Sequence, residues 1–269
     1  MQGGLVVRTG RGRYALPQVE AGLRAAHGMS GVLSHESAAA WWGWESATVP
    51  TEAVVTVPHD RKPHPRAGVR LSFRDLSATD RVPPGVTSPE RTVLDCATTM
   101  SFPEALAIAD SALRHCAVDK DGLMLAAAAS PLRGRRRRMR VAGAADGRAA
   151  NPFESVLRAM SLEVGLDVEP QVWIHTPHGW VRPDLLDERR GVAIEAESFT
   201  WHGRRDQLSR DCRKYNDLTL AGLRLLRFSW EQVFLDVDDV WETLVRVRTG
   251  IAPWASAAGT HPEGQRRSA

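Results

Sequence analysis

The sequence predicts an α/β (α+β) protein of two domains, and three observations support this prediction. Strand-like and helix-like stretches alternate along the 269 residues, a length that allows two hydrophobic cores. Residues 151–249 open on a helix signal and continue as strands, a helix and a further strand, which indicates a mixed sheet flanked by helices. An Arg-rich stretch at 130–150, expected to be a linker, separates this part from a smaller α/β domain at 1–129.

The composition is typical of a globular protein, with 43% hydrophobic and 25% charged residues. No run of about 18 apolar residues occurs, so no membrane partner is expected. The N-terminus lacks the basic-then-apolar pattern of a secretory signal. Cys96, Cys116 and Cys212 fit neither a disulfide framework nor a zinc site, so we expect reduced thiols in a cytoplasmic protein.

Charge is distributed unevenly behind the net value of +3. Residues 1–150 carry 20 Lys and Arg against 14 Asp and Glu, whereas residues 151–249 carry 13 against 17. If the partner is nucleic acid, much of the attraction to phosphate must come from the first half of the chain.

The first half begins with a tight basic hairpin at 5–17. Such a hairpin is what a winged helix-turn-helix uses as its wing, although an ordinary edge hairpin fits the same residues. A helix capped by Ser34 is expected to end at Gly43, and strands are expected at 53–57 and 69–73.

Helices dominate the remainder of the first half. Ser88 as N-cap and Pro89 at the first helical position predict the start of one helix. Further helices are expected at 103–115 and 122–129.

Three motifs in this half occur in the order GVLSHESAA at 31–39, VTVP at 55–58 and TSPERTVLD at 87–95. Together they resemble the AbiEi-type antitoxin domains of bacterial type IV toxin–antitoxin proteins, over roughly residues 1–125. The resemblance implies a DNA-binding or interaction module with a toxin as partner, in which the hairpin is the remnant of a winged helix.

The sequence RGRRRRMR at 133–140 places six arginines in eight positions. Two interpretations are open: a solvated linker, or a segment that neutralises phosphate beside a metal site. The candidate nucleic-acid contacts here are Arg135, Arg136, Arg137 and Arg138.

The second domain is expected to start with a helix at 153–164. Asn151 as N-cap, Pro152 at the first position and Glu154 two residues later resemble a capping box. The following elements are a strand at 168–176, a hairpin, a crossover helix at 203–221, a parallel inner strand at 223–228 and a last helix from Asp238 to about Arg248. Residues 250–269 are expected to be disordered because they are rich in Ala, Gly, Pro and Ser.

The hairpin carries acidic residues inside apolar, strand-like sequence. Its strands are expected at 181–186 and 192–197, and a tip at Arg189 and Arg190 would place Asp184 directly opposite Glu195. Glu197 lies two residues further along, so all three carboxylates would share one face of the sheet. Like charges in that arrangement need neutralisation, and carboxylate oxygens without His or Cys suit Mg²⁺ or Mn²⁺.

The order of a helix with Glu, a strand, a strand with P-D, a strand with E-x-E, a crossover helix and a strand resembles the core of the PD-(D/E)xK nuclease superfamily (restriction-endonuclease-like). Within it, EAESFTWHG at 195–203, RDCRKYN at 210–216 and GLRLLRFSW at 222–230 are similar to very-short-patch-repair-like endonuclease domains. This second resemblance covers residues 151–248.

The resemblance implies roles for individual residues. Asp184 and Glu195 would bind the metal, and Ala196 would contribute its backbone carbonyl. Glu197 stands where the superfamily usually has Lys, and would act as a general base or help to hold a second metal. Glu154 would join the metal shell or only cap its helix, and His202 would contact phosphate, shuttle protons or serve the structure alone.

Three basic residues of the crossover helix could face DNA, or could pair with Asp206 and Asp211 of the same helix. They are Arg210, Arg213 and Lys214.

The sequence thus favours a Mg²⁺-dependent DNA endonuclease that hydrolyses phosphodiester bonds. A non-catalytic DNA-binding regulator or antitoxin with an inactive nuclease fold is the alternative, and a scaffold without a nucleic-acid role is a third interpretation. Cleavage of both DNA strands would require two such sites, hence a homodimer or two sequential nicks.

Overall fold

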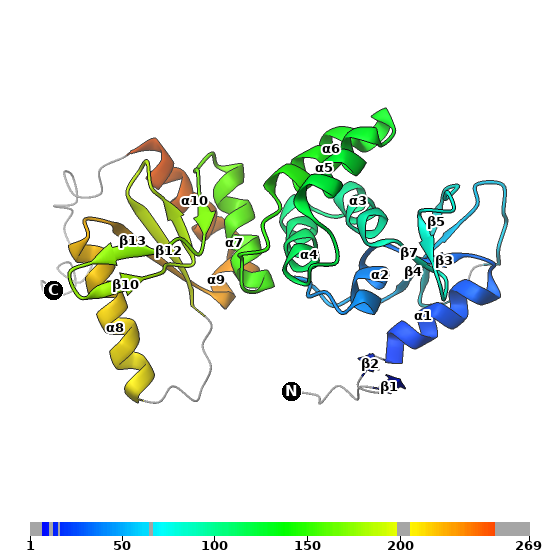
Figure 1. Ribbon diagram of the computed structural model, residues 1–269, viewed down its shortest axis with the longest axis horizontal. Coiled ribbons are helices and arrows are strands. Elements are labelled where there is room, and N and C mark those ends of the chain that lie inside the picture. The colour runs from blue at the N-terminus through cyan, green and yellow to red at the C-terminus, as the bar shows by residue number, and fades with distance from the viewer. Residues whose placement is uncertain (1–6, 11–12, 16, 65–66, 198–204, 251–269) are drawn as a thin grey trace, which may run out of the picture.

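The structure, a computed structural model, describes residues 7–10, 13–15, 17–64, 67–197 and 205–250 (Figure 1). It confirms a mixed α/β protein, with helices around several sheets. None of the helices in these ranges has the length and apolar character needed to cross a membrane. All three cysteines are free thiols, as expected.

The N-terminal hairpin forms as predicted. Strand β1 (Val7–Gly10) pairs antiparallel with β2 (Arg13–Ala15). Of the remaining residues of the predicted hairpin at 5–17, Pro17 begins a helix, and the others lie outside the described ranges. Helix α1 (Pro17–Gly28) follows directly and was not predicted. Its apolar stripe is narrow, and Leu23 and Ala26 belong to the hydrophobic cluster of the first sheet.

A five-stranded sheet in the order β5-β4-β3-β7-β6 occupies the first half, and β4 pairs with β5 in parallel. The strands are β3 (Val32–Leu33), β4 (Ala53–Val57), β5 (Val69–Phe73), β6 (Arg81–Val82) and β7 (Val86–Thr87). The predicted strands at 53–57 and 69–73 are therefore confirmed. Gly31 is required before β3, because a Cβ there would lie 2.6 Å from Cγ1 of Val55 and 2.9 Å from the carbonyl oxygen of Thr56.

Helix α2 (His35–Trp42) has the predicted bounds, but Ser34 does not cap it with its side chain. The hydroxyl of Ser34 instead accepts a hydrogen bond from Thr56 Oγ1 at 2.8 Å and lies 2.9 Å from Nδ1 of His35. The buried contact to β4 replaces the local cap, since the side chain is fully buried between helix and sheet.

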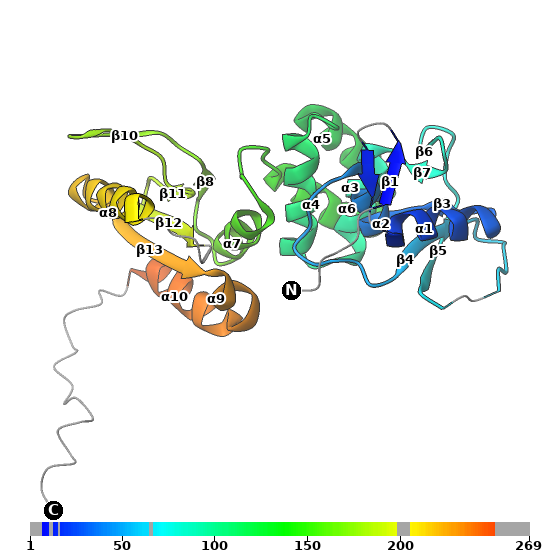
Figure 2. The same cartoon turned by 90° about the horizontal axis from the view of Figure 1, so that it is seen from below.

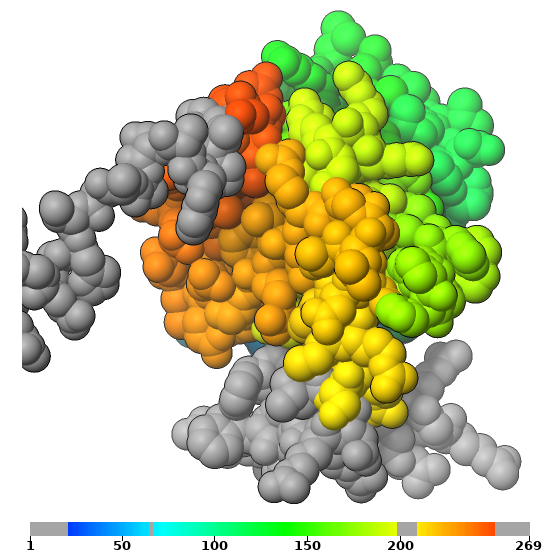
Figure 3. All heavy atoms as spheres, turned by 90° about the vertical axis from the view of Figure 1, so that its left-hand side faces the viewer, coloured from blue at the N-terminus to red at the C-terminus, as the bar shows by residue number. Residues whose placement is uncertain are grey.

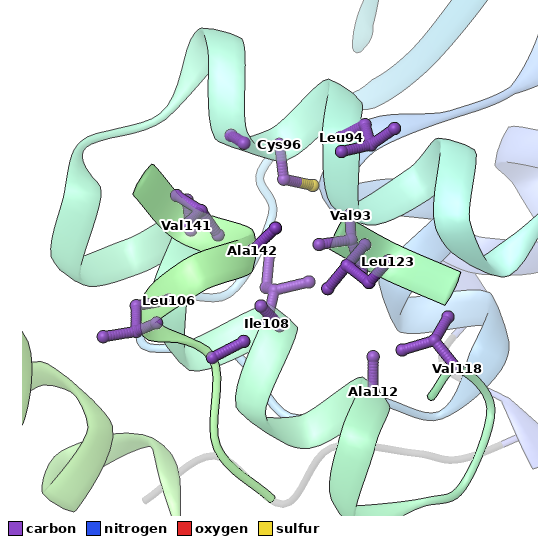
Figure 4. Packing of buried hydrophobic residues seen from close by; sticks show 14 of the residues in the cluster. Val93, Leu94, Cys96, Leu106, Ile108, Ala112, Val118, Leu123, Val141 and Ala142 are labelled. Atoms are coloured by element: carbon purple, nitrogen blue, oxygen red, sulfur yellow. The ribbon is translucent and has the colours of Figure 1, made fainter. Parts of the chain in front are cut away.

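Four helices complete the first half around one hydrophobic core (Figure 4). They are α3 (Pro89–Thr99), α4 (Phe102–Arg114), α5 (Lys120–Ala129) and α6 (Leu132–Ala144). Ser88 caps α3 as predicted by accepting a hydrogen bond from the backbone N–H of Arg91. In Figure 4, Leu106 and Ile108 of α4 face Val141 and Ala142 of α6.

The prediction of a linker at 130–150 was wrong. Most of this stretch is helix α6, which packs on α3, α4 and α5 through Val141 and Ala142, both fully buried. The sequence pattern did not reveal this helix, because its first turns are rich in arginine and its buried apolar residues lie only near its C-terminal end. Gly134, at φ +81°, bends the first turn of the helix.

The second half has the predicted mixed sheet, in the order β13-β12-β11-β8. Its elements in the described residues are α7 (Pro152–Glu163), β8 (Glu169–Pro170), β9 (Ile174–Thr176), β10 (Gly179–Val181), β11 (Leu185–Asp187), β12 (Val192–Glu197), α8 (Arg205–Leu220), β13 (Arg224–Ser229), α9 (Trp230–Leu235) and α10 (Val237–Thr249). Strand β13 runs parallel to β12 after the crossover helix α8, as expected. The predicted disordered tail at 250–269 lies outside the described residues except for Gly250.

The hairpin register was predicted correctly, because Leu185 pairs with Ile194 and Asp187 with Val192. Asp184 precedes the ladder and does not belong to it. The single strand predicted at 168–176 is wrong: it divides into β8 and β9 at Gln171, whose φ is +58°. Strand β9 then pairs with β10 in a separate two-stranded sheet, seen extending beside α8 in Figure 2.

The two halves meet where α7 packs against α4 (Figure 1). Ala159 of α7 belongs to the core of the first half, and Ala107 of α4 to that of the second. Between these helices the guanidinium of Arg158 donates to both carboxylate oxygens of Asp110 at 2.7 Å, and both side chains are at most 3% exposed. The junction is therefore a packed interface.

Asp110→Ala should lower the free energy of unfolding by about 3–5 kcal/mol, because Arg158 would remain buried without its counter-ion. Urea denaturation of the full chain measures this change. Glu163→Ala is the matched control, since it removes the more exposed pair with Arg140 and should change the free energy by less than about 1 kcal/mol. Equal effects of the two substitutions would show that the buried pair does not hold the junction together.

Candidate metal and phosphate site

Four acidic residues gather at one end of the second sheet and form what we call the carboxylate cluster: Glu154, Asp184, Glu195 and Glu197. They come from the start of α7, from the segment before β11 and from β12. Their charges interact, because Asp184 raises the pKa of both Glu154 and Glu195, and Glu197 raises that of Glu195 further. The four carboxylates therefore lie close enough for their charges to interact, although Asp184 comes before the ladder and does not pair with Glu195 within it.

Glu154 is buried at the first turn of α7. Its Oε2 accepts the backbone N–H of Ala150 at 2.9 Å and the side-chain amide of Gln171 at 3.0 Å, and Oε1 accepts the amide of Asn151 at 2.8 Å. Burial, and then the charge of Asp184, raise the pKa of this carboxyl group. Asn151 caps the helix, and the Glu154 carboxylate holds the Asn151 side chain and the preceding Ala150 N–H while it faces the cluster.

Asp184 is held in place from two sides. Its Oδ2 accepts the backbone N–H of Ala196 at 2.8 Å, and its Oδ1 accepts the amide of Gln171 at 3.2 Å. It pairs with neither Arg182 nor Arg227 in the described structure. Because each carboxylate oxygen has two lone pairs, both oxygens keep capacity for another ligand.

Gln171 was not identified from the sequence. Its amide nitrogen donates to both Glu154 and Asp184, and so joins α7 to the hairpin. The left-handed backbone at this residue breaks the strand and turns the side chain toward the cluster. No sequence signal marks it, since a glutamine after a proline in a strand pattern has no chemical signature of its own.

Glu195 is the most constrained member of the cluster, at 4% exposure on the inner strand β12. Its Oε2 accepts a hydrogen bond from Nζ of Lys214 at 2.7 Å, while Oε1 is buried without a partner among the described atoms. Burial, reinforced by Asp184, raises its pKa to about 7, and Lys214 only partly offsets this effect. A carboxylate oxygen left without a donor is a position where a cation would be stabilised.

Lys214 contacts the cluster through Glu195 while its side chain stays 27% exposed, and its contact with DNA stays a prediction. It reaches Glu195 from α8, whereas the resembling superfamily carries its lysine on the strand, at the position that Glu197 occupies here. Arg210 and Arg213 are exposed on the same side of α8, since residues three and four apart share a helix face. Figure 3 looks onto this half of the molecule and shows α8, in yellow, at its surface.

Glu197 is already engaged by two partners. Its Oε1 accepts hydrogen bonds from the hydroxyl of Tyr215 and from Nε of Arg227, the latter at 2.9 Å. The guanidinium of Arg227 also lies over the ring of Tyr215, 4.1 Å from its centroid. Burial and the neighbouring carboxylate raise the pKa of Tyr215, so the phenol remains a donor. Oε1 of Glu197 is therefore occupied by hydrogen bonds within the protein, and the roles of general base or ligand of a second metal stay predictions.

Ala196 and His202 are the two other predicted site residues of this half. The backbone N–H of Ala196 holds Asp184, which keeps this residue at the cluster. His202 lies outside the described residues.

The arginine run is divided between structure and surface. Arg138 is 2% exposed and donates to the carbonyl oxygens of Pro131 and Arg133, so its predicted contact with phosphate is wrong. Arg135 donates to the carbonyl of Ser130 at 2.7 Å and Arg137 to that of Thr98 at 2.9 Å. The arginines of the run thus donate hydrogen bonds to backbone carbonyl groups near helix ends. Arg136 and Arg137 remain exposed.

The fit of a metal can be tested on the side chains themselves. Within the described ranges, no group of three or more His, Cys, Asp or Glu residues is arranged to hold a metal ion. Mg²⁺, however, is commonly bound by one or two carboxylates together with water and substrate phosphate. Asp184 and Glu195 supply such a pair of carboxylates. Oε1 of Glu195 accepts no hydrogen bond from the described atoms and so could serve as a metal ligand. The residues therefore fit a hard divalent ion with two protein ligands.

Comparison with known proteins gives two relatives. Uncharacterized protein MT2308 of Mycobacterium tuberculosis (strain CDC 1551 / Oshkosh) is 29% identical over 264 residues, which cover 94% of this chain and 93% of the relative. The same values hold for Uncharacterized protein Rv2248 of strain ATCC 25618 / H37Rv. No family model matches the chain. The similarity extends over both halves, so their combination in one chain is shared with these relatives.

The wild-type protein should lose stability as pH rises from about 4.5 to about 7, relative to Glu195→Gln. In this window the folded chain keeps the Glu195 proton that the unfolded chain has released, so the free energy of unfolding falls with pH and levels off above the folded pKa. The difference should reach at most about 3 kcal/mol. Urea denaturation at pH 4.5, 6 and 8 measures it, and parallel pH curves for the two proteins would contradict the raised pKa.

Proposed function

We propose that the protein is a Mg²⁺- or Mn²⁺-dependent endonuclease that hydrolyses phosphodiester bonds of DNA. The observation that carries this proposal is the contact of Lys214 with Glu195, beside Asp184 in one buried cluster. Two carboxylates that can bind a hard cation, together with an ammonium group that can face an anion, form a set suited to phosphoryl chemistry.

The topology supports the same proposal. Helix α7, strands β8, β11 and β12, crossover helix α8 and strand β13 follow the order of the PD-(D/E)xK core. Asp184 stands directly before β11, and Glu195 lies within β12. A fold alone does not establish activity, so the argument rests on the side chains of the cluster.

Asp184 and Glu195 would hold the metal, which would activate a water molecule and stabilise charge on the phosphate. The protein's own contribution is to fix these ligands in position. Gln171 and the N–H of Ala196 orient Asp184, while the ladder with β13 fixes the backbone of Glu195.

Lys214 would take the role that a lysine at position 197 performs in the resembling superfamily. Its ammonium keeps Glu195 closer to the ionised state, and it would place a positive charge beside an incoming phosphate. Glu197, held by Tyr215 and Arg227, would then position Arg227 and not act as a base.

A non-catalytic DNA-binding regulator or antitoxin is the second candidate. The engagement of Glu197 favours it, as does the lack of a three-ligand metal group in the described residues. In that case the basic first half, with its antitoxin-like motifs, would bind DNA or a toxin, and the second half would be an inactive nuclease fold. A homodimer would be needed only by an enzyme that cuts both strands in one event.

Supercoiled plasmid incubated with the protein and Mg²⁺ should be nicked, and Asp184→Asn, Glu195→Gln and Lys214→Met should each reduce the rate roughly 100-fold or more. Gel separation of supercoiled and open-circular plasmid measures the rate. The first two variants should fail because a metal ligand is lost, and the third because the cation beside the phosphate is lost.

Glu242→Gln serves as the matched control, because this exposed carboxylate pairs only with Arg246 in the described structure and lies on α10. It should nick plasmid at the wild-type rate. Plasmid binding by the wild type without any metal-dependent nicking would reject the enzyme and favour the regulator.

A further inference from the structure

Two tryptophans on the β9–β10 sheet and its approach are unusually exposed. Trp173 is 58% and Trp180 65% exposed, and together they line an open recess of about 460 Å³. Large indole rings left in water are unfavourable unless a partner covers them.

The β9–β10 sheet carries Trp180 and begins one residue after Trp173, and it is held by contacts at its ladder and its turn. Trp180 pairs with His175 across the ladder, and their rings meet edge to face with centroids 5.0 Å apart. At the turn, Nδ1 of His178 lies 2.5 Å from Oδ1 of the buried Asp217 on α8. This contact joins the β9–β10 hairpin to α8, beside which it runs in Figure 2.

The tryptophans are tied to the carboxylate cluster by very short lengths of chain. Trp173 follows Gln171, which contacts the cluster, by two residues, and Trp180 precedes Asp184 by four. Since one residue spans at most about 3.6 Å, the Cα atom of Trp173 lies within about 7 Å of that of Gln171. A strand of nucleic acid whose backbone reaches the cluster would thus bring its bases to the indole rings.

The charge around the rings also points to nucleic acid. The guanidinium of Arg182 lies over the ring of Trp173, 4.9 Å from its centroid. Arg210 and Arg213 are exposed on α8, where the i to i+4 spacing places Arg210 beside Lys214 and Arg213 beside Asp217. Aromatic rings flanked by cations are the usual means of binding the bases and backbone of a single strand.

We propose that Trp173 and Trp180, with Arg182, stack on unpaired nucleobases of the DNA strand that passes the carboxylate cluster. The substrate class would then be single-stranded DNA or a duplex with locally unpaired bases. This inference rests on the proposed function, since it uses the cluster to orient the strand.

Fluorescence anisotropy of the full-length protein with labelled oligothymidylate, in EDTA to prevent cleavage, tests this inference. An oligonucleotide of equal length with abasic sites carries the same backbone charge and serves as the competitor without bases. The wild type should bind oligothymidylate roughly tenfold or more tightly than the abasic strand. The double variant Trp173→Ala/Trp180→Ala should bind both strands with one affinity, while Phe73→Ala, which removes an exposed ring from β5, should preserve the preference.

Equal binding of the two strands by the wild type, or an unchanged preference in the double variant, would overturn the inference. A concentration-dependent dimer that the double variant abolishes would also overturn it, by assigning the rings to a second copy of the chain. The result is separable from plasmid nicking: base-dependent binding without nicking supports the inference and rejects the enzyme. Nicking without base-dependent binding supports the enzyme and rejects the inference.

Discussion

The burial of the Glu195 carboxylate within the second sheet is the constraint on which the rest of the site depends. A charge at 4% exposure is stable only with a counter-ion or a proton. Lys214 provides one partner from α8, and the raised pKa shows that this compensation is incomplete. Part of the negative charge therefore stays uncompensated at Oε1, which accepts no hydrogen bond from the described atoms. A divalent cation would compensate it.

The first half of the chain also contributes to the construction of the site. Arg114 of α4 donates to the carbonyl of Ala149, one residue before the N–H that binds Glu154. The Arg158 and Asp110 pair fixes α7, and hence Glu154, against α4. The junction therefore sets the position of one member of the carboxylate cluster, and a packed interface suits this task better than the flexible linker that the arginine run suggested.

What the sequence could predict follows from the range of each interaction. Alternation along a strand and a turn at Arg189 and Arg190 determine register locally, so the opposition of the hairpin strands could be worked out in advance. The roles of Gln171 and Lys214 could not, because each depends on elements that meet only after folding. The caps at Ser88 and Asn151 were local and correct, whereas Ser34 was drawn away from its cap by a tertiary contact with β4.

Titration with Mn²⁺, followed by electron paramagnetic resonance of the free ion, tests the central claim most directly. The account predicts a saturable site in the wild-type protein at pH 8, where Glu195 is ionised, that weakens at pH 6. Asp184→Asn and Glu195→Gln should each abolish the site, and Glu242→Gln should leave it intact. Mn²⁺ binding that survives both cluster substitutions, or no saturable binding at either pH, would contradict a metal-dependent role for the carboxylate cluster.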